Sequence, residues 1–495
     1  MLTFEFSAIF LVVGLLLTVA SAQKNPHYVG NRTTMVHLFE WKWNDVADEC
    51  ERFLGPKGYA GVQVSPITEN IVVPNRPWYE RYQPISYKWS TRSGNEREFR
   101  SMVRRCNKAG VRIYVDAVLN HMTAGQENAR GTGGSRAYGK EYPAVPYTSE
   151  SFHDKCDINY GLAWTVRDCE LVGLHDLDQS RPEVQDRIVA FLDKAVDAGV
   201  AGFRIDAAKH MWPDHLRQIY ARVKNLNTDH GFEPNSRPFI FQEVIDYGNE
   251  VVSKYEYNQF AAVLEFKHAR ELCAGIRGQN PLKWFKTWGP HWGLLPSEDA
   301  VTFVDNHDTQ RDGGGSPPLT HKEFRMYKMA VAFMLAHPYG HPRVMSSFRF
   351  SAFDQGPPAD ESGNLISPAI LSDGTCGNGW VCEHRWRQIF NMVGFRNHVA
   401  GTELTNWWDN GLGQVAFCRG NRGFVAINTQ HADLRQRLQT CLPAGIYCDL
   451  ITGDLVDGRC SGLSLRVDEH GWADVEILTS FHDGVVAYHT AAKAA

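Results

Sequence analysis

Several common signals are absent from this chain of 495 residues. No CxxC pair occurs, which excludes the usual cysteine-based metal motifs. No basic run is interleaved with aromatic residues and the net charge is −5, so no nucleic-acid partner is expected. No repeat or low-complexity linker is found, and beyond the first 22 residues no apolar run is long enough to span a bilayer, so we expect no membrane partner. The length predicts about three globular domains.

The chain begins with an apolar run from Ala8 to Ala20, which ends in the small-residue sequence Ala20-Ser21-Ala22. We interpret residues 1–22 as a signal peptide and expect a secreted, extracellular protein. The segment before the run contains Glu5 and neither Lys nor Arg, which is atypical of a signal peptide. The alternative is a membrane anchor, which is disfavoured because a span needs about 20 apolar residues.

The chain contains 11 cysteines. In an exported protein most of them should be paired, and the odd total leaves at least one that is free or bonded to another chain. Asn31-Arg32-Thr33 is the only N-x-S/T sequence, so Asn31 is a candidate glycosylation site.

Four apolar segments end in acidic residues, in order along the chain: 111–121, 202–210, 239–243 and 301–308. In the second, Arg204 and Asp206 share one face of a short strand, because residues two apart on a strand point the same way. A cation and a carboxylate on one side of an apolar strand are costly to bury unless a site uses them. The four segments therefore predict one active site assembled from several strand ends.

Short β-type segments alternate with helical stretches from about residue 35 to residue 400. The predicted strands include 59–64, 111–118, 202–205, 239–242 and 301–304, and the stretch 181–198 has apolar residues at helical spacing. This alternation predicts parallel βα units. We therefore predict an α/β fold, a (β/α)8 TIM barrel formed by residues 23–119 and 178–402, with its active site at the carboxyl ends of the strands.

Two further domains are predicted. Residues 120–177 follow the third barrel strand, are rich in Gly, Ser, Asn and Tyr, and are too many for a simple loop, so we predict a small inserted domain. Residues 403–495 contain strand-like segments at 415–418, 423–428 and 485–489. We predict that they form a C-terminal all-β domain of Greek-key type.

Asp206, Glu243 and Asp308 have the residue type and strand-end position that glycoside hydrolysis needs. One carboxylate attacks the anomeric carbon while a second carboxyl group protonates the leaving oxygen. A third acid can hold sugar hydroxyls. Acidic strand ends alone are a weak signal, because they could equally bind metal ions.

The residues around these acids resemble the α-amylase family. Segments 116–121, 202–210, Glu243 and 303–308 resemble its four signature regions, in order, and segments 76–84, 334–340, 343–347 and 421–424 resemble animal-type α-amylases in particular. The resemblance covers nearly the whole mature chain. It implies an endo-acting hydrolase of α-1,4-glucans that retains the anomeric configuration.

The resemblance also implies roles for the matched residues. Asp206 would be the nucleophile, Glu243 the general acid and then base, and Asp308 would bind and distort the reacting sugar. Arg204 would keep Asp206 ionised, because a nearby cation lowers the pKa of a carboxyl group. The implied sugar contacts are Trp78, Tyr79, Tyr82, Gln83, His121, Lys209, His210 and His307. Taken alone, each histidine would more often be structural and the aromatic residues a core cluster.

Two bound ions are implied as well. A calcium ion would be held by the side chains of Asn120 and Asp176 and by the carbonyl groups of Arg167 and His210, an all-oxygen set that suits calcium. A chloride ion would be held by Arg204, Asn306 and Arg343, and its charge would favour the protonated form of Glu243. The alternative for Arg343 is a simple ion pair with a carboxylate.

Disulfides implied by the resemblance are Cys50–Cys106, Cys156–Cys169, Cys376–Cys382 and Cys448–Cys460. Cys418 and Cys441 fall outside that set, and we predict that they pair because both lie in the β domain. Cys273 is then a free thiol, which we expect to be buried on a barrel helix.

The sequence departs from the animal-type pattern at a few positions. The glycine-rich segment 311–318 looks shorter and lacks a histidine, and His175 stands where an apolar residue is more usual. These departures and the additional cysteine pair resemble the amylase-related paralogues of flies. They leave the preferred chain length open.

Two other functions remain alternatives to an active hydrolase. One is a secreted glucan-binding paralogue with a weak or dead site, which the presence of all three acids disfavours. The other is an α-glucosidase or glucan transferase, which the animal-type motifs disfavour. We expect a monomer whose partner is an α-glucan.

Overall fold

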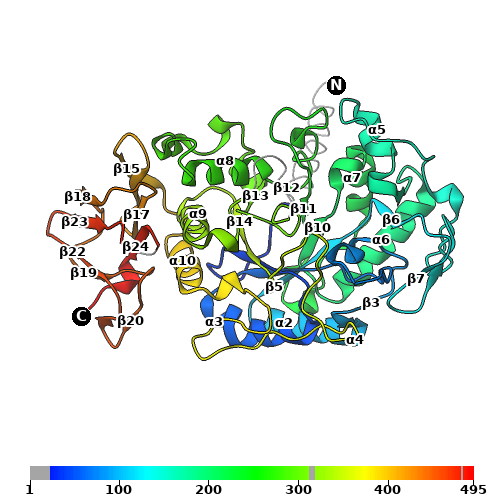
Figure 1. Cartoon of the computed structure of the whole chain (residues 1–495), viewed down its shortest axis with the longest axis horizontal. Coiled ribbons are helices and arrows are strands. Elements are labelled where there is room, and N and C mark those ends of the chain that lie inside the picture. The colour runs from blue at the N-terminus through cyan, green and yellow to red at the C-terminus, as the bar shows by residue number, and fades with distance from the viewer. Residues whose placement is uncertain (1–22, 312–317, 481–482) are drawn as a thin grey trace, which may run out of the picture.

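The computed structural model describes residues 23–311, 318–480 and 483–495 (Figure 1). At its centre eight strands form a closed barrel in the order β1-β14-β13-β12-β11-β10-β5-β2. All neighbouring pairs are parallel, which confirms the predicted (β/α)8 barrel. The strands are β1 (Met35–Leu38), β2 (Gly61–Val64), β5 (Arg112–Ala117), β10 (Gly202–Ile205), β11 (Phe239–Gln242), β12 (Ala262–Leu264), β13 (Ala300–Thr302) and β14 (His341–Ser346).

The barrel strands are short and apolar because both of their faces are covered. Every residue of β2, β10 and β11 is buried. The predicted strands 202–205 and 239–242 coincide with β10 and β11. The register sets Arg204 of β10 between Asp116 of β5 and Phe241 of β11. The backbone pairing therefore already brings a cation beside a carboxylate in the barrel interior.

Helices follow most of the strands and cover the outside of the barrel. The first turn of α4 is closed by a capping box between Asn95 and Glu98. The predicted helix 181–198 corresponds to α6, which begins at Pro182, a residue favoured in the first helical turn. The longer helices are α2 (Trp43–Glu49), α4 (Glu96–Lys108), α6 (Pro182–Asp197), α7 (Pro213–Arg222), α8 (Phe266–Ile276), α9 (Phe324–Ala336) and α10 (Arg387–His398).

A small insertion separates β5 from α6 and lies at the right of Figure 1. Its elements are β6 (His121–Ala124), β7 (Ala129–Arg130), β8 (Arg136–Ala137), α5 (Ala163–Asp168) and β9 (Leu174–Asp176). Strands β6 and β9 are antiparallel, with His121 opposite Asp176. The beginning and the end of the insertion are therefore joined next to the barrel.

The C-terminal residues form an all-β unit, as predicted, at the end of the molecule opposite the insertion (Figure 1). The pairs β17–β24, β18–β23, β19–β22 and β20–β21 are nested, as in a long antiparallel ribbon that folds over itself. The strands are β15 (Leu404–Asp409), β16 (Gln414–Arg419), β17 (Gly423–Asn428), β18 (Leu434–Gln439), β19 (Gly445–Cys448), β20 (Leu455–Val456), β21 (Arg459–Cys460), β22 (Ser464–Val467), β23 (Trp472–Ile477) and β24 (Val485–His489).

All five expected disulfides are present: Cys50–Cys106, Cys156–Cys169, Cys376–Cys382, Cys418–Cys441 and Cys448–Cys460. The pairing of Cys418 with Cys441 crosslinks β16 to the segment after β18. Cys273 is a buried free thiol on α8, as expected, and its sulfur accepts the backbone N–H of Leu319 at 3.2 Å.

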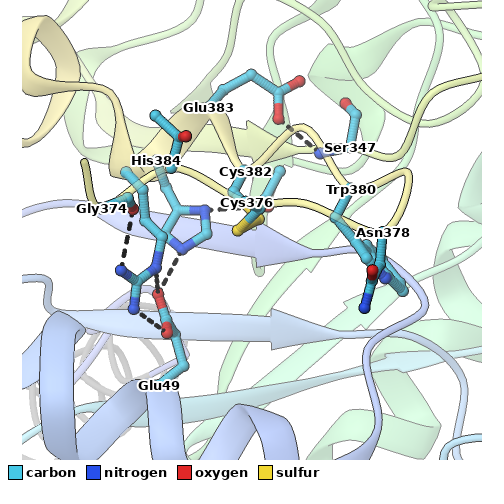
Figure 2. The surroundings of a disulfide bond; sticks show 12 residues. Glu49, Ser347, Gly374, Cys376, Asn378, Trp380, Cys382, Glu383 and His384 are labelled. Carbon is cyan, nitrogen blue, oxygen red and sulfur yellow. Dashed lines mark hydrogen bonds and ion pairs between the residues drawn. A yellow bond between two sulfur atoms is a disulfide. The ribbon is translucent and has the colours of Figure 1, made fainter. Parts of the chain in front are cut away.

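The Cys376–Cys382 disulfide lies where the segment after β14 meets the first βα unit (Figure 2). Glu49, at the end of α2, accepts hydrogen bonds from His384 at 2.8 Å and from Arg385 at 2.6 Å. Ser347, directly after β14, donates its N–H to Glu383 at 2.7 Å. These contacts join the last βα unit to the first and help to close the barrel.

Two features of the sequence lie outside the described residues: the expected signal peptide, residues 1–22, and most of the glycine-rich segment, residues 312–317. Within the described ranges, no helix is both long enough and apolar enough to cross a membrane.

Gly202 tests how tightly the barrel is packed at β10. A Cβ atom at this position would lie 1.9 Å from the carbonyl oxygen of Phe239 on β11. Gly202→Ala should therefore lower the free energy of unfolding by about 1–3 kcal/mol, because the strand has to shift. Urea denaturation of the purified variant measures this.

Gly394→Ala is the matched control, because Gly394 lies inside α10 and a methyl group added there would meet no described atom within 4 Å apart from its chain neighbours and the backbone of its own helix. This change should leave stability unchanged or raise it by up to about 1 kcal/mol. Equal stability of the two variants would contradict the close packing at β10.

Candidate active site

Three acidic side chains meet at the carboxyl ends of the barrel strands β10, β11 and β13. Asp206 directly follows β10, Glu243 directly follows β11, and Asp308 lies in the loop after β13. Backbone hydrogen bonds extend the barrel pattern through the first two, from Asp206 to Ala117 at 3.0 Å and from Glu243 to Ile205 at 2.9 Å. All three acids line one cavity of about 260 Å³. The predicted convergence of acid-tipped strands is therefore present.

A single guanidinium group links the carboxyl groups of this cluster. Arg204 Nη1 lies 2.6 Å from Asp116 Oδ1 and 2.8 Å from Asp206 Oδ1, and Nη2 lies 2.7 Å from Glu243 Oε1. The Arg204 side chain is 1% exposed. Tyr82 supports the arrangement by donating its hydroxyl to Asp116 Oδ2 at 2.9 Å. The acids of β5 and of the ends of β10 and β11 thus share one buried positive charge.

Burial governs the protonation of the cluster. Burial raises the pKa of Asp206 well above its ordinary value and also raises that of Asp116, and the charge of Arg204 opposes the rise only in part. The cation lies where we expected it, but burial outweighs it, so the pKa of Asp206 is raised rather than lowered. Three carboxyl groups around one guanidinium cannot all be ionised cheaply, and the cluster therefore favours retaining a proton.

The chain turns sharply after Asp206 and in doing so fixes Glu243. Ala207 has left-handed backbone angles, φ 48° and ψ 31°, a conformation that costs about 1 kcal/mol or more for a residue with a Cβ. In this turn the N–H of Ala207 donates to Glu243 Oε2 at 2.8 Å, and the N–H of Lys209 donates to the Glu243 carbonyl at 3.1 Å. The strained turn therefore orients the carboxyl group of Glu243.

Asp308 is held beside a stack of rings. The His307 imidazole stacks on Tyr82 at 4.9 Å and on Phe39 at 5.0 Å, and its Nε2 atom lies 3.2 Å from Asp308 Oδ2. Burial lowers the pKa of His307 well below its ordinary value, so the ring is neutral at neutral pH. The Asp308 side chain is 42% exposed, and its partial burial together with the charge of Glu243 raises its pKa above the ordinary value.

Most of the predicted sugar contacts line the same cavity. These are Trp78, Tyr79, Tyr82, His121, Lys209, His210 and His307. Gln83 does not line it, because its side-chain oxygen accepts the backbone N–H of Ala124 at 3.1 Å. Gln83 therefore ties the aromatic loop to the insertion.

The two other cavity histidines are fixed by backbone carbonyl groups. His121 Nε2 lies 2.9 Å from the carbonyl oxygen of Tyr82, and His210 Nδ1 lies 2.8 Å from that of Val166. Burial lowers the pKa of each to about 4. Both rings are thus neutral near pH 7 and present uncharged hydrogen-bonding edges.

The sequence did not indicate one wall of the cavity. The lining residues that it did not indicate are Tyr160, Leu171, Leu174, Ile245 and Ala207, and we call the first four a wall of the cavity. Three of the four side chains come from the insertion, and none belongs to an acid-tipped strand. The aromatic ring of Tyr160 in a Gly- and Asn-rich stretch was the one available signal.

The four residues expected to bind calcium lie where the insertion meets the barrel. Asn120 Oδ1 is buried and has no hydrogen-bond partner within the described residues, while its Nδ2 donates to Asp176 Oδ1 at 3.1 Å. The carbonyl oxygens of Arg167 and His210 likewise accept no hydrogen bond from the described part of the chain. His153, which sequence reasoning missed, lies 2.7 Å from Asp176 Oδ2. Unpartnered oxygens of Asn120, Arg167 and His210 therefore come from both domains, whereas both oxygens of Asp176 have partners in Asn120 and His153.

The residues expected to bind chloride supply unpartnered donors. Arg204 Nε and Arg343 Nη2 are buried without a hydrogen-bond partner in the part of the chain that the structure describes. Burial and the nearby charge of Arg204 lower the pKa of Arg343 to about 10. Arg343 forms no ion pair with a described carboxylate and donates instead to Gln63 at 2.5 Å. Asn306 uses its oxygen for the N–H groups of Asp308 and Thr309, which leaves its Nδ2 for another acceptor.

Comparisons with known proteins agree with this geometry. Residues 53–342 match a family model of the α-amylase catalytic domain, and residues 405–491 match one of the α-amylase C-terminal all-β domain. The chain is 58% identical to an α-amylase-related protein of Drosophila willistoni, over 98% of this chain and 99% of the relative. It is 56% identical to an α-amylase-related protein of Drosophila melanogaster, over 99% and 100%.

A solved structure is similar over almost the whole chain. It is a complex of a mutant α-amylase I from Eisenia fetida with maltohexaose, 40% identical in sequence. The TM-score is 0.89, and the match covers 94% of this chain and 98% of that one.

Proposed function

The chain belongs to the α-amylase family of glycoside hydrolases, and we propose that it is an active, endo-acting hydrolase of α-1,4-glucans that retains the anomeric configuration. The observation that carries the proposal is the guanidinium of Arg204, which bridges Asp206 and Glu243 inside a cavity at the barrel's carboxyl end. One guanidinium reaches both carboxyl groups only if they lie close together. Two close carboxyl groups are what the retaining mechanism needs, at a spacing of about 5–5.5 Å.

In the proposed first step Asp206 attacks the anomeric carbon and Glu243 gives its proton to the departing glycosidic oxygen, which leaves a glycosyl ester on Asp206. In the second step Glu243 takes a proton from water as the water attacks the ester, and Asp206 is released. Before the first step one acid must be ionised and the other protonated. A cluster in which three carboxyl groups share one cation favours that mixed state.

The cavity lining supports a sugar substrate. Trp78 and Tyr79 present flat apolar faces, on which the C–H surfaces of glucose stack. The neutral imidazoles of His121 and His307, with Asp308, offer partners for hydroxyl groups. The linear α-glucan in the similar Eisenia structure supports maltooligosaccharides as the substrate class.

The alternative of a weak or dead glucan-binding paralogue is less well supported. All three acids are present, and Ala207 adopts a strained backbone conformation that orients Glu243. Strain of this kind is expected to be kept where chemistry needs it. Five disulfides support the proposal that the chain is exported after removal of residues 1–22.

We also propose a calcium site formed by Asn120, Asp176 and the carbonyl groups of Arg167 and His210. Calcium would supply a link between the insertion and the barrel. His210 and Lys209 follow Asp206 in sequence, so the same link would steady one wall of the cavity.

The proposed chloride site consists of Arg204, Asn306 and Arg343. The anion would supply a fixed negative charge between two buried guanidinium groups. Arg204 contacts Glu243 directly, with 2.7 Å between its Nη2 and Glu243 Oε1. Partial neutralisation of Arg204 would therefore favour the protonated form of Glu243, which the first step needs.

Asp206→Asn should lower kcat by several orders of magnitude because the attacking charge is lost, and Glu243→Gln should do so because proton transfer is lost. Single-turnover hydrolysis of maltohexaose measures both. Asp214→Asn, on the exposed surface of α7, is the control and should retain wild-type turnover. Near-normal kcat in a folded Asp206→Asn preparation would refute the assignment. The anomer of the first product, recorded by NMR, tests retention.

Removal of calcium should lower the melting temperature, and re-addition should restore it, because ligand binding to the folded state stabilises it. Asp176→Asn should weaken this calcium dependence. Asp360→Asn, at an exposed loop, is the control and should preserve it. A melting temperature that excess chelator leaves unchanged, with metal loss verified, argues against the site.

Added chloride should raise activity to a plateau and should move the alkaline limb of the pH–rate profile to higher pH, because the anion favours the protonated form of Glu243. Arg343→Gln should weaken or abolish that response while retaining some activity. Arg349→Gln, an exposed arginine nearby in sequence, serves as the control and should respond like the wild type. Activity indifferent to chloride across the pH range, after exhaustive dialysis, would leave Arg343 with a structural role only.

A further inference from the structure

A second arginine, Arg311, is enclosed by aromatic rings beside the active site. Its guanidinium carbon lies 4.2 Å from the ring centre of Phe350, 5.1 Å from Phe348, 5.2 Å from Trp78 and 5.6 Å from Phe39. Guanidinium groups are attracted to the faces of such rings. We call these four residues the aromatic cage.

The cage is assembled from three separate loops at the carboxyl end of the barrel. Phe39 follows β1, Trp78 begins the 3-10 turn Trp78–Tyr82 after β2, and Phe348 and Phe350 follow β14. Arg311 comes from a fourth loop, after β13. Its side chain therefore lies at a junction between the loop that carries Asp308 and the loop that carries Trp78.

Arg311 also fixes the backbone around Asp308. Its Nη1 donates to the carbonyl oxygen of His307 at 2.6 Å, and its own N–H donates to the carbonyl oxygen of Asp308 at 2.9 Å. Its Nε is buried and has no hydrogen-bond partner among the described residues. One side chain thus contacts the backbone on the amino side of Asp308 and the ring of Trp78.

This arrangement is a costly way to place a cation. Burial lowers the pKa of Arg311 to about 10, so the group is still charged at neutral pH. No described carboxylate lies within 4 Å of it, so the rings and the His307 carbonyl provide the compensation. A half-buried charge with no carboxylate partner is unfavourable for folding. Its presence here points to a requirement of the site.

The cage is itself supported from behind. Phe348 packs edge-on against Trp380 at 6.1 Å, and their backbones form a β-bridge. Trp380 lies within the loop closed by Cys376–Cys382, as Figure 2 shows. The wall against which Arg311 packs is therefore tied to the contacts that close the barrel.

We propose that Arg311 is a positioning residue, which couples the sugar-stacking ring of Trp78 to the orientation of Asp308. The proposal rests on the proposed glucan hydrolysis. The guanidinium of Arg311 packs on the Trp78 ring and also holds the His307 carbonyl next to Asp308. It therefore fixes the distance between a sugar stacked on Trp78 and a sugar whose hydroxyl groups Asp308 binds. A planar, forked side chain suits both contacts, and lysine can supply only the charge.

The coupling has an electrostatic consequence. The titratable or charged groups that face Asp308 are Glu243, Arg204, Asp116, His307, Arg311 and Tyr82. Arg204 and Arg311 are the cations of this set and stabilise the ionised form of Asp308. Loss of the Arg311 charge should therefore make Asp308 harder to ionise, and the acidic limb of the pH profile should move to higher pH.

Two variants separate the contribution of the planar guanidinium group of Arg311 from that of its positive charge. Arg311→Lys keeps the charge, so the acidic limb should stay in place while KM for maltohexaose rises about ten-fold, as for loss of one well-packed contact. Arg311→Met loses both the planar group and the charge. KM should therefore rise, and the acidic limb of the pH profile of kcat/KM should move to higher pH by about half a unit, as for one charge removed at several ångströms.

Lys322→Met is the matched control. Lys322 is exposed, lies 3.9 Å from the ring centre of Phe350 and does not line the active-site cavity, so both parameters should stay at wild-type values.

Calorimetric titration of maltohexaose into Glu243→Gln, with and without Arg311→Lys, separates this proposal from the proposed function. If the wild type hydrolyses maltohexaose and neither Arg311 variant changes KM or the acidic limb, the positioning role is overturned. A fall in kcat and melting temperature alone also overturns it, since that indicates a structural role. If the wild type hydrolyses no α-glucan, but Arg311→Lys still weakens binding to Glu243→Gln, the positioning role stands and the proposed function fails. Should Arg311→Met not fold, Arg311→Lys decides.

Discussion

The buried guanidinium of Arg204 is the interaction on which the rest of the site depends. A charge removed from water in this way costs several kcal/mol unless partners compensate it. Here Asp116, Asp206 and Glu243 compensate it, from β5 and from the ends of β10 and β11. Without the cation three buried acids would face one another. The spacing of the two reacting carboxyl groups and the proton that the cluster retains therefore both follow from a single side chain, and the barrel register sets that side chain in place.

Barrel and loops contribute differently to this site. The strands supply charges at fixed separations, because each strand end is locked by backbone pairing on both sides. The loops and the insertion supply the surfaces that would touch sugar, such as Trp78 and Tyr160. Chain-length preference is then a property of the loops, whereas the bond-breaking chemistry is a property of the strand ends. The all-β unit lies at the other end of the molecule, and none of its described residues lines the cavity.

The sequence predicted the strand ends well because their signals are local. A buried run that stops at an acid defines its own boundary, and 202–205 and 239–242 coincide with β10 and β11. Local signals could not show how Arg204 divides its hydrogen bonds, or that burial outweighs its effect on the pKa of Asp206. They also gave no indication of Leu171 and Leu174, whose role arises only when the insertion folds back over the barrel. The paired cysteines could be placed because covalent partners are few, whereas packing partners are many.

Arg204 and Arg311 show two ways in which one site buries a guanidinium group. Arg204 is surrounded by carboxyl groups, so its charge is matched and the acids become dependent on it. Arg311 is surrounded by rings and has no described carboxylate within 4 Å, so its charge acts at longer range on Asp308. The first arrangement fixes distances between reacting groups, and the second joins the sugar-stacking loop to the loop that holds the third acid. Because both cations stabilise ionised acids in one cavity, the protonation of the site and its geometry cannot be changed independently.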